Sequence, residues 1–185
     1  MKTLIQLGCN TGSDILDFVK ASDYDFILLV DANPFCIEAA KNLFKNVQNV
    51  YYDVQAISAE AKPVTFYIPH YEIHKTSAHS SLSKSHVLKH GHDEQMMKEI
   101  QMQSITFNDL MKRHSLSSVD RLYIDCEGED VPIVLSIDFT SFQINYIKYE
   151  HGHASEKDKQ KAVQYLQDNG YVLEISGGDT IATKS

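Results

Sequence analysis

The chain has 185 residues, of which 43% are hydrophobic and 23% charged, so it can bury a core of ordinary size. Its 17 basic and 25 acidic side chains leave a net charge of −8, which disfavours nucleic acid or an anionic membrane as a partner. The three cysteines are far apart and no apolar run is long enough to span a membrane. We therefore expect free thiols, no membrane association and a cytoplasmic location.

Short apolar runs alternate with amphipathic segments, which is the pattern of β–α–β units and a parallel sheet. Strands are predicted at residues 3–7, 26–31, 49–54, 64–68, 120–125 and 144–150, and a hairpin at residues 171–176 and 180–183. Helices are predicted after a cap at Ser13 or Thr11, from Pro34, after Thr106, over residues 129–137 and from Ser155 to Gln167. The predicted fold class is α/β. It is a single domain over residues 1–185, with a mostly parallel central sheet, helices on both faces and a C-terminal antiparallel hairpin.

Residues 70–99 interrupt this alternation. They contain six of the nine histidines (His70, His74, His79, His86, His90 and His92) and few large apolar side chains, and regular structure resumes at residues 101–105. We predict a mobile insertion with one helix near residues 93–100, which acts as a lid or binds the acceptor. The histidine spacing fits no tetrahedral metal template, so solvated lid residues are favoured and no metal ligand is predicted.

The strongest functional signal runs from Leu122 to Asp130. An apolar strand reaches two acids, Asp125 and Glu127, and Gly128 then lets the backbone turn. Two close carboxylates can raise one pKa and supply a general base. Capping of the turn is the structural alternative, and a functional role is favoured over it.

Glu150, His151 and His153 follow the next parallel strand. Either histidine could accept a proton near neutral pH, or join the two acids in holding a divalent ion. A surface turn that happens to contain histidines is an equally good interpretation.

Earlier strand ends carry glycines and acids as well. Gly8 and Gly12 flank a turn before a helix, whose free N–H groups attract carboxylate or phosphate, although an ordinary tight turn fits equally well. Asp31 ends the following strand, where an acid can accept both ribose hydroxyls, and this role is favoured over capping. Asp53 ends the third strand, where it could contact an adenine edge or be a solvated acid. Together these ends predict one nucleoside-binding crevice.

At these residues the chain resembles, nearly end to end, the FkbM-type branch of class I S-adenosylmethionine-dependent methyltransferases. The matching elements are Gly8 to Gly12 with Asn10 between, Val30 to Pro34, Gln55 to Ser58, Ser80 to Leu82, Ile124 to Glu129, Tyr149 to His151, and Gly170 with Tyr171. The resemblance implies a Rossmann-like fold, S-adenosylmethionine as cofactor, and methyl transfer to a hydroxyl oxygen of a sugar or another small metabolite.

The residue patterns and the resemblance together give the candidate site. The candidate cofactor-binding residues are Gly8, Asn10, Thr11, Gly12, Asp31, Ala32, Asn33, Asp53, Gln55, Ala56 and Asp125. The candidates for the base are Asp125, Glu127, Glu150 and His151, in no fixed order. We expect a small-molecule acceptor, and leave a divalent metal and a homo-oligomer as open alternatives.

Three positions depart from the family pattern. Gln6 stands where the family usually has an acid that helps hold the methionine end of the cofactor, and Tyr123 stands where it often has lysine. The chain also begins almost at its first strand, where many relatives carry more residues. The alternative function is therefore a cofactor-binding or interaction module without catalysis. A nicotinamide-dependent oxidoreductase is disfavoured by the two-glycine turn and the acids of the fourth strand.

Overall fold

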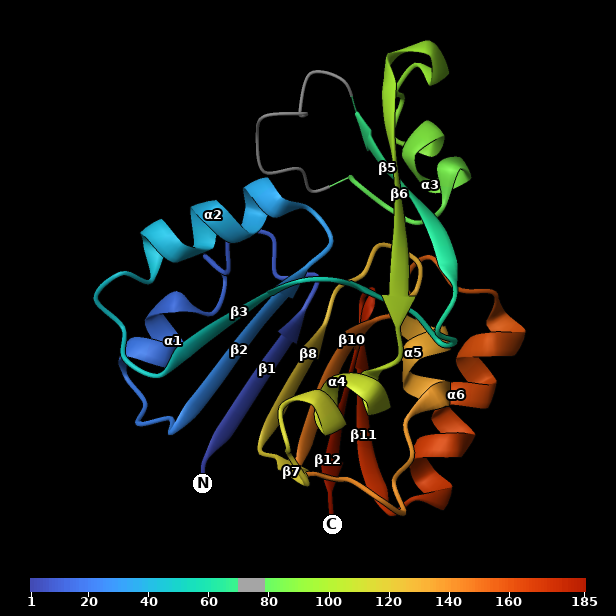
Figure 1. The fold of residues 1–185 in the computed structure, drawn as a ribbon. Coiled ribbons are helices and arrows are strands. Elements are labelled where there is room, and N and C mark those ends of the chain that lie inside the picture. Colours follow the sequence, from blue (N-terminus) through green and yellow to red (C-terminus); the bar gives the residue numbers. More distant parts are fainter. Residues whose placement is uncertain (70–78) are drawn as a thin grey trace.

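A seven-stranded sheet forms the centre of the protein, in a computed structural model that describes residues 1–69 and 79–185 (Figure 1). Its strands lie in the order β11 (Tyr171–Ser176), β12 (Asp179–Lys184), β10 (Tyr146–Glu150), β8 (Arg121–Ile124), β1 (Thr3–Leu7), β2 (Phe26–Asp31) and β3 (Val50–Val54). The strands from β10 to β3 are parallel, whereas β12 is antiparallel to both of its neighbours. The predicted sheet and its C-terminal hairpin are confirmed.

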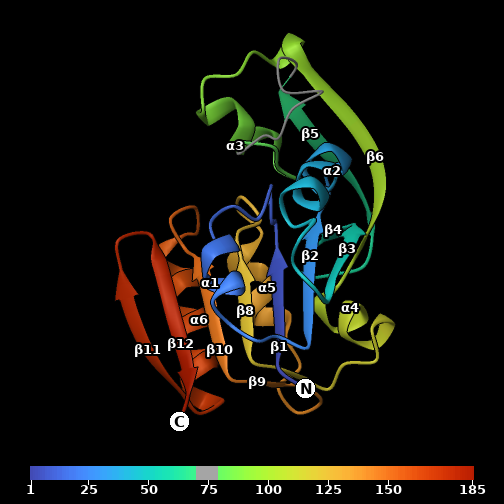
Figure 2. The same ribbon diagram turned by 90° about the vertical axis from the view of Figure 1, so that its left-hand side faces the viewer.

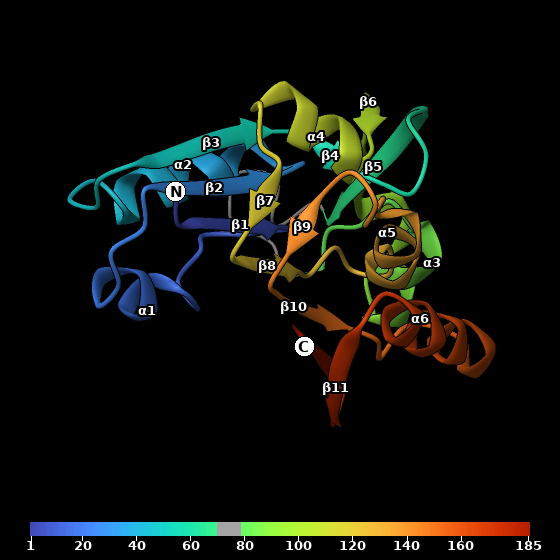
Figure 3. The same ribbon diagram turned by 90° about the horizontal axis from the view of Figure 1, so that it is seen from below.

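Helices cover both faces of this sheet, because its buried strands present apolar side chains to both sides. Within β1, for example, Leu4 belongs to one apolar layer and Ile5 to the other. Figure 3 shows α1 and α4 on opposite sides of the sheet. The helices of the first layer are α1 (Leu16–Lys20) and α2 (Pro34–Leu43), and those of the second are α4 (Phe107–Arg113), α5 (Asp130–Ser136) and α6 (Glu156–Asp168).

Local capping chemistry sets where most of these helices begin. Thr106 and Asp109 form a reciprocal capping box at α4, and the Ser155 side chain accepts the N–H of Asp158 at α6, both as predicted. Asn33 caps α2 in the same way. The predicted cap of α1 at Ser13 or Thr11 is wrong, because α1 begins after Ile15 without a side-chain cap.

A second, smaller sheet stands over the carboxyl ends of the central strands (Figure 2). Its strands are β4 (Ala56–Ile57), β6 (Met97–Ile105) and β5 (Pro63–Pro69), with α3 (Lys84–Lys89) and a 3₁₀ turn at Glu94–Met96 beside them. We call β5, β6 and α3, together with residues 79–83 before α3 and residues 90–96 after it, the arm. A short parallel pair, β7 (Ser118–Val119) and β9 (Gln143–Ile144), lies at the other end of the molecule.

The arm corrects the prediction for residues 70–99. The helix expected near residues 93–100 is wrong, because β6 already begins at Met97 and pairs with β5 from Pro69↔Met97 to Pro63↔Gln103. An isolated β5 would leave its backbone groups unpaired, so pairing overrides any local helical tendency. The described part of the insertion supplies a helix and half of a hairpin, while residues 70–78, with His70 and His74, lie outside the described residues. No helix within residues 1–69 and 79–185 is long and apolar enough to cross a membrane.

Gly8 lets the end of β1 lie directly against the main chain that follows β8. Its backbone has a φ of +68°, and a Cβ atom placed there would lie 1.8 Å from the carbonyl oxygen of Asp125. A side chain at this position is therefore excluded twice, by the left-handed backbone and by the neighbouring main chain.

We expect Gly8→Ala to destabilise the protein by at least about 3 kcal/mol more than the same substitution at another glycine that has a positive φ. Gly177→Ala is the matched control, since Gly177 has a φ of +59° but no atom would lie within 4 Å of its Cβ. The control should cost only about 1–2 kcal/mol. Urea unfolding of both variants measures the difference, and equal losses would contradict the close approach.

Candidate functional site

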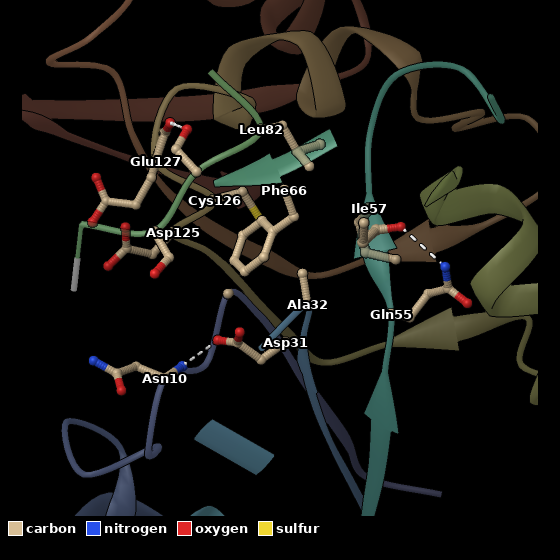
Figure 4. A pocket seen from close by; sticks show the side chains of 14 residues that line it. Asn10, Asp31, Ala32, Gln55, Ile57, Phe66, Leu82, Asp125, Cys126 and Glu127 are labelled. Carbon is tan, nitrogen blue, oxygen red and sulfur yellow. Dashed lines mark hydrogen bonds between the residues drawn. The ribbon is translucent and has the colours of Figure 1, made fainter. Parts of the chain in front are cut away.

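The carboxyl ends of β1, β2 and β8 surround one hollow, and the arm covers it (Figure 4). Ligands of open α/β sheets bind at such strand ends. The residues that line this strand-end hollow are Gly8, Asn10, Asp31, Ala32, Gln55, Ala56, Ile57, Phe66, Ser80, Ser81, Leu82, Asp125, Cys126 and Glu127.

Asp31 is fixed by backbone N–H groups from the loops after β1 and β2. Its two carboxylate oxygens accept the N–H of Asn10 and the N–H of Asn33, each at 2.8 Å. Asn10 adopts a φ of +47°, which turns its N–H toward β2. Burial raises the pKa of the Asp31 carboxyl to about 6, against the effect of these two hydrogen bonds. The carboxylate is oriented, and its remaining lone pairs can still accept hydroxyl groups.

Asp125 and Glu127 lie on the loop after β8 rather than within the strand. Burial raises the pKa of Asp125 to about 6, and the nearby Glu150 carboxylate adds to the rise. Burial likewise raises the pKa of Glu127 to about 8, with a further contribution from Asp125. Within the described part of the chain, no hydrogen bond or ion pair engages the Asp125 carboxylate. This end of the hollow thus gathers carboxyl groups, and the positive charge of Lys148 only partly offsets the rise in the Asp125 pKa.

The glycine turn after these acids is capped by a residue that the sequence did not single out. Asp130 is buried and accepts the N–H groups of Cys126 and Gly128, at 3.0 and 3.2 Å. Asp125 and Glu127 are therefore not needed to cap the turn, which was the structural alternative for them. Glu127 itself has a φ of +50°, a costly conformation for a residue with a side chain.

Asp14 is a second acid that sequence reasoning missed. The Gln6 side-chain amide donates to both of its carboxylate oxygens, at 3.1 and 3.0 Å. The negative charge of Asp14 contributes to the raised pKa of Asp125, so the two carboxylates lie in the same electrostatic environment. The glutamine in β1 thereby holds a carboxylate beside the position where an acid was expected.

Eight of the predicted residues line the strand-end hollow. They are Gly8, Asn10, Asp31, Ala32, Gln55, Ala56, Asp125 and Glu127. Ile57 and Cys126 also line it; they lie within elements matched by the family resemblance but were not among the candidate site residues. Phe66 was not predicted, because its position depends on how the arm folds. Ser80, Ser81 and Leu82, noted only through the family resemblance, come from the arm.

Other predicted residues do not line it. Asp53 lies 2.9 Å from the Nε2 atom of His114 and 3.6 Å from Arg113, so its carboxylate faces the end of α4. The ring of His151 is buried against Thr180, 2.9 Å away, and borders a different hollow beside α6. Glu150 does not line the hollow, but its negative charge contributes to the raised pKa of Asp125. Its carboxylate lies 3.5 Å from the Nε2 atom of His153.

The remaining three predicted residues support the main chain around the hollow. Asn33 is buried as the cap of α2, with its side chain accepting the N–H of Phe35 at 3.0 Å. Gly12 packs so closely on Phe44 that a Cβ would lie 2.8 Å from its ring. Thr11 sits between the two glycines of the turn. They support the strand end rather than form the surface of the hollow.

The arm is attached to the site by Ser81. Its hydroxyl donates to the carbonyl of Glu127 at 2.7 Å and accepts the N–H of Ser83 at 3.0 Å. Its backbone exchanges two hydrogen bonds with Tyr67 in β5. This one serine therefore connects β5, the start of α3 and the loop after β8.

Histidines of the arm also reach the acids. His86 is only 5% exposed, with Nε2 2.8 Å from a carboxylate oxygen of Glu127. Burial lowers the pKa of His86 to about 4, and the neighbouring His153 adds to the shift, so the ring is neutral. The expectation that the insertion's histidines are solvated is wrong for His86.

The model of the methyltransferase FkbM domain matches residues 5–173. No curated protein matches the sequence.

Solved structures share the fold at low sequence identity. The precorrin-6y C5,15-methyltransferase of Geobacter metallireducens has a TM-score of 0.55 at 13% identity, covering 100% of this chain and 80% of that chain. Aeropyrum pernix fibrillarin with natively bound S-adenosyl-L-methionine has a TM-score of 0.52 at 13% identity, covering 98% and 65%. A Streptococcus mutans protein in complex with SAH has a TM-score of 0.54 at 6% identity, covering 100% and 89%. The predicted Rossmann-like fold is confirmed.

We expect Ser81→Ala to loosen the arm without unfolding the sheet. The change leaves the Glu127 carbonyl without its donor and the Ser83 N–H without its acceptor, a loss of about 1–3 kcal/mol. Hydrogen exchange at the Tyr67 and Ser81 amides should therefore accelerate about tenfold or more. Ser85→Ala is the control, because among the described residues the exposed Ser85 hydroxyl forms a hydrogen bond with the Ser83 hydroxyl alone. Unchanged exchange in the Ser81 variant would refute this attachment.

Proposed function

The chain belongs to the FkbM methyltransferase family, and on this premise we propose that it transfers the methyl group of S-adenosylmethionine to a hydroxyl oxygen of a sugar or another small metabolite. The observation that carries this proposal is the gathering of carboxylates around the strand-end hollow. Burial raises the pKa values of Asp31, Asp125 and Glu127 there, and the charges of neighbouring carboxylates add to the rise. A cationic sulfonium is the kind of ligand that such a site favours.

The adenosyl part of the cofactor would lie across the ends of β1 and β2. Asp31, already oriented by two backbone N–H groups, is placed to accept the ribose hydroxyls. Ala32, Ala56 and Ile57 offer an apolar surface next to it for the adenine. The absence of a side chain at Gly8 lets the turn after β8 close against the end of β1, so that both main chains would border the cofactor.

The methionine end would lie toward Asp14. We propose that Asp14, held by the Gln6 amide, binds the cofactor's ammonium group in place of the acid expected at Gln6. This arrangement favours an active enzyme, because the departure at Gln6 is matched by a carboxylate from the following loop.

For methyl transfer the protein has to align the reacting groups, exclude water from the site and provide a proton acceptor. The acceptor oxygen attacks the methyl carbon, the O–CH₃ bond forms, and the S–CH₃ bond breaks with its electron pair remaining on the now neutral sulfur. The hydroxyl proton passes to a carboxylate. Asp125 is the best placed of the candidate bases, since no hydrogen bond or ion pair in the described part of the chain engages its carboxylate. Histidine nitrogens lie 2.8 Å from Glu127 and 3.5 Å from Glu150, and His151 faces elsewhere.

The arm would provide the acceptor's side of the site. Phe66 and Leu82 give it an apolar wall, and the buried Ser80 hydroxyl has no hydrogen-bond partner among the described residues. An unpaired buried hydroxyl is costly and suits a polar ligand that completes it. A small hydroxylated acceptor meets both requirements.

The second candidate is a module that binds the cofactor without transferring its methyl group, and the glutamine at position 6 is the feature in its favour. An activity assay distinguishes the two candidate functions. Binding of the cofactor with no methyl transfer to any of a panel of sugars and hydroxylated metabolites would favour the module.

We expect Asp31→Ala to weaken binding of S-adenosylhomocysteine by about tenfold or more, because charge-assisted bonds to the ribose would be lost. Asp25→Ala is the matched control, since Asp25 lies just before the opposite end of the same strand and its carboxylate accepts the N–H of Lys2. Isothermal titration calorimetry of both variants gives the comparison. Equal affinity in the Asp31 variant and the wild type would rule out this contact.

The same contact predicts a pH dependence. Burial raises the pKa of free Asp31 to about 6, and ribose hydroxyls donate more strongly to its charged form, so binding lowers that pKa. Affinity for S-adenosylhomocysteine should be constant above about pH 7 and fall as the pH drops through about 6, with proton release on binding. Calorimetry between about pH 5 and pH 8, in two buffers of different ionisation enthalpy, measures both effects. A flat profile would contradict the prediction, and Asp31→Ala should flatten the slope.

We expect Asp125→Asn to lower turnover by about 10²–10⁴-fold, the usual contribution of a general base, with much less effect on cofactor affinity. Glu129→Gln is the control, because it removes a charge from the same turn but does not line the hollow. Single-turnover methyl transfer to the acceptor that the panel identifies gives the rate. Undiminished turnover in Asp125→Asn would exclude it as the base.

A further inference from the structure

Four side chains from three separate segments meet beside the strand-end hollow. His86 and His90 come from α3 and its C-terminal cap, Glu127 follows β8, and His153 follows β10. One potential ligand atom from each of the four lies within 4.8 Å of all the others. We call these residues the histidine–glutamate cluster.

The sequence spacing of the two arm histidines places them on one side of their helix. His86 and His90 are four residues apart, and side chains with this spacing lie one above the other. Ser83 fixes the start of α3 because its side chain accepts the N–H of His86. The helix therefore presents both imidazoles together to Glu127 and His153.

His86 is the feature that points to a ligand. Its Nε2 atom lies 2.8 Å from Glu127, yet the two groups are not aligned for a hydrogen bond. Nε2 is one of the buried side-chain atoms in residues 1–69 and 79–185 that have no hydrogen-bond partner. A buried polar atom left unpaired costs about 1–3 kcal/mol, so something else should complete it.

Ring packing alone does not account for the arrangement. The His86 ring meets the His153 ring edge to face, with centroids 4.5 Å apart, and packs at 4.6 Å from the His90 ring. Such contacts explain why the rings are close. They do not explain why the Nε2 atom of His86 and a carboxylate oxygen of Glu127 converge without a hydrogen bond.

The donor set selects the kind of ion. Three imidazole nitrogens and one carboxylate oxygen suit a divalent transition metal, whereas Mg²⁺ and Ca²⁺ prefer oxygen ligands throughout. A tetrahedral Zn²⁺ with bonds of about 2.0–2.1 Å separates its ligand atoms by about 3.3 Å. The distances from Glu127 to the His86 and His153 nitrogens, 2.8 and 3.9 Å, fall on either side of that value.

We propose that the histidine–glutamate cluster binds one divalent transition-metal ion, best matched by Zn²⁺, and that this ion fastens the arm to the ends of β8 and β10. His90 and His153 are exposed, so the ion can enter from solvent. The metal adds a second attachment to the one made by Ser81 and Glu127. It thereby fixes the cover of the hollow, a role that goes beyond methyl transfer itself.

Metal titration of the full chain tests the proposal directly. The protein is purified, freed of any histidine tag, stripped with a chelator and titrated with Zn²⁺ by calorimetry, with elemental analysis of the dialysed product. The variants are His86→Gln and His153→Gln. The matched control is His114→Gln, whose Nε2 also lies beside a carboxylate, 2.9 Å from Asp53, but outside the cluster.

We expect one Zn²⁺ per chain in the wild type and in His114→Gln, and affinity at least about a hundredfold weaker in His86→Gln and His153→Gln. Co²⁺ bound to the wild type should show the visible absorption of a tetrahedral site, and His153→Gln should lose it. No stoichiometric Zn²⁺ binding to the wild type, or unchanged binding in both cluster variants, would overturn the proposal.

Two further measurements separate this site from the proposed function and from misfolding. Affinity for S-adenosylhomocysteine, measured on the same samples, tests the cofactor site, so either site can fail without the other. Circular dichroism reports whether each variant is folded, and because His153 is exposed on a loop, His153→Gln keeps the test valid if His86→Gln unfolds.

Zn²⁺ should slow hydrogen exchange in α3 of the wild type about tenfold or more and leave exchange in His153→Gln unchanged. Equal exchange with and without Zn²⁺ would refute the fastening role.

Discussion

The site depends on one close approach between two backbones. At Gly8 the end of β1 turns with a positive φ directly against the Asp125 carbonyl, leaving no room for a side chain. This contact, together with the parallel pairing of β1 with β2 and β8, brings Asp31 and Asp125 to the same hollow. The proposed cofactor site is thus produced by main-chain geometry, and the acids complete it.

The electrostatics of the hollow are a consequence of that geometry. Carboxylates from successive strand ends are brought together in a partly buried space, so their pKa values rise. The repulsion between these carboxylates destabilises the ligand-free site, and a cationic ligand can offset it. Glu127 extends the same acidic surface toward the arm, where His86 meets it. One charge environment therefore connects the proposed cofactor site to the proposed metal site.

The sequence predicted the parts of the fold that follow from local patterns. Strands such as β1 and β2, whose apolar runs end in a glycine or an acid, have the predicted bounds, and caps such as Thr106 were correct because they act within one helical turn. Long-range pairing was not predictable in the same way. The helix expected near residues 93–100 became part of β6 because β5 required a partner, and Asp53 turned toward His114 on α4. The sequence raised Glu127 and His153 as possible partners in an ion site, because they follow neighbouring parallel strands, but it missed His86 and His90, which only the folded arm brings to them. The single domain over residues 1–185 and the cytoplasmic location stay predictions.

The central claim is that neighbouring strand ends converge to hold an adenosyl sulfonium. A crystal structure of the protein grown with S-adenosylhomocysteine tests it most directly. The account predicts the ribose within hydrogen-bonding distance of Asp31, the sulfur facing Asp125, and the main chain at Gly8 alongside. Ligand density at any other surface, with this hollow filled only by solvent, would contradict it.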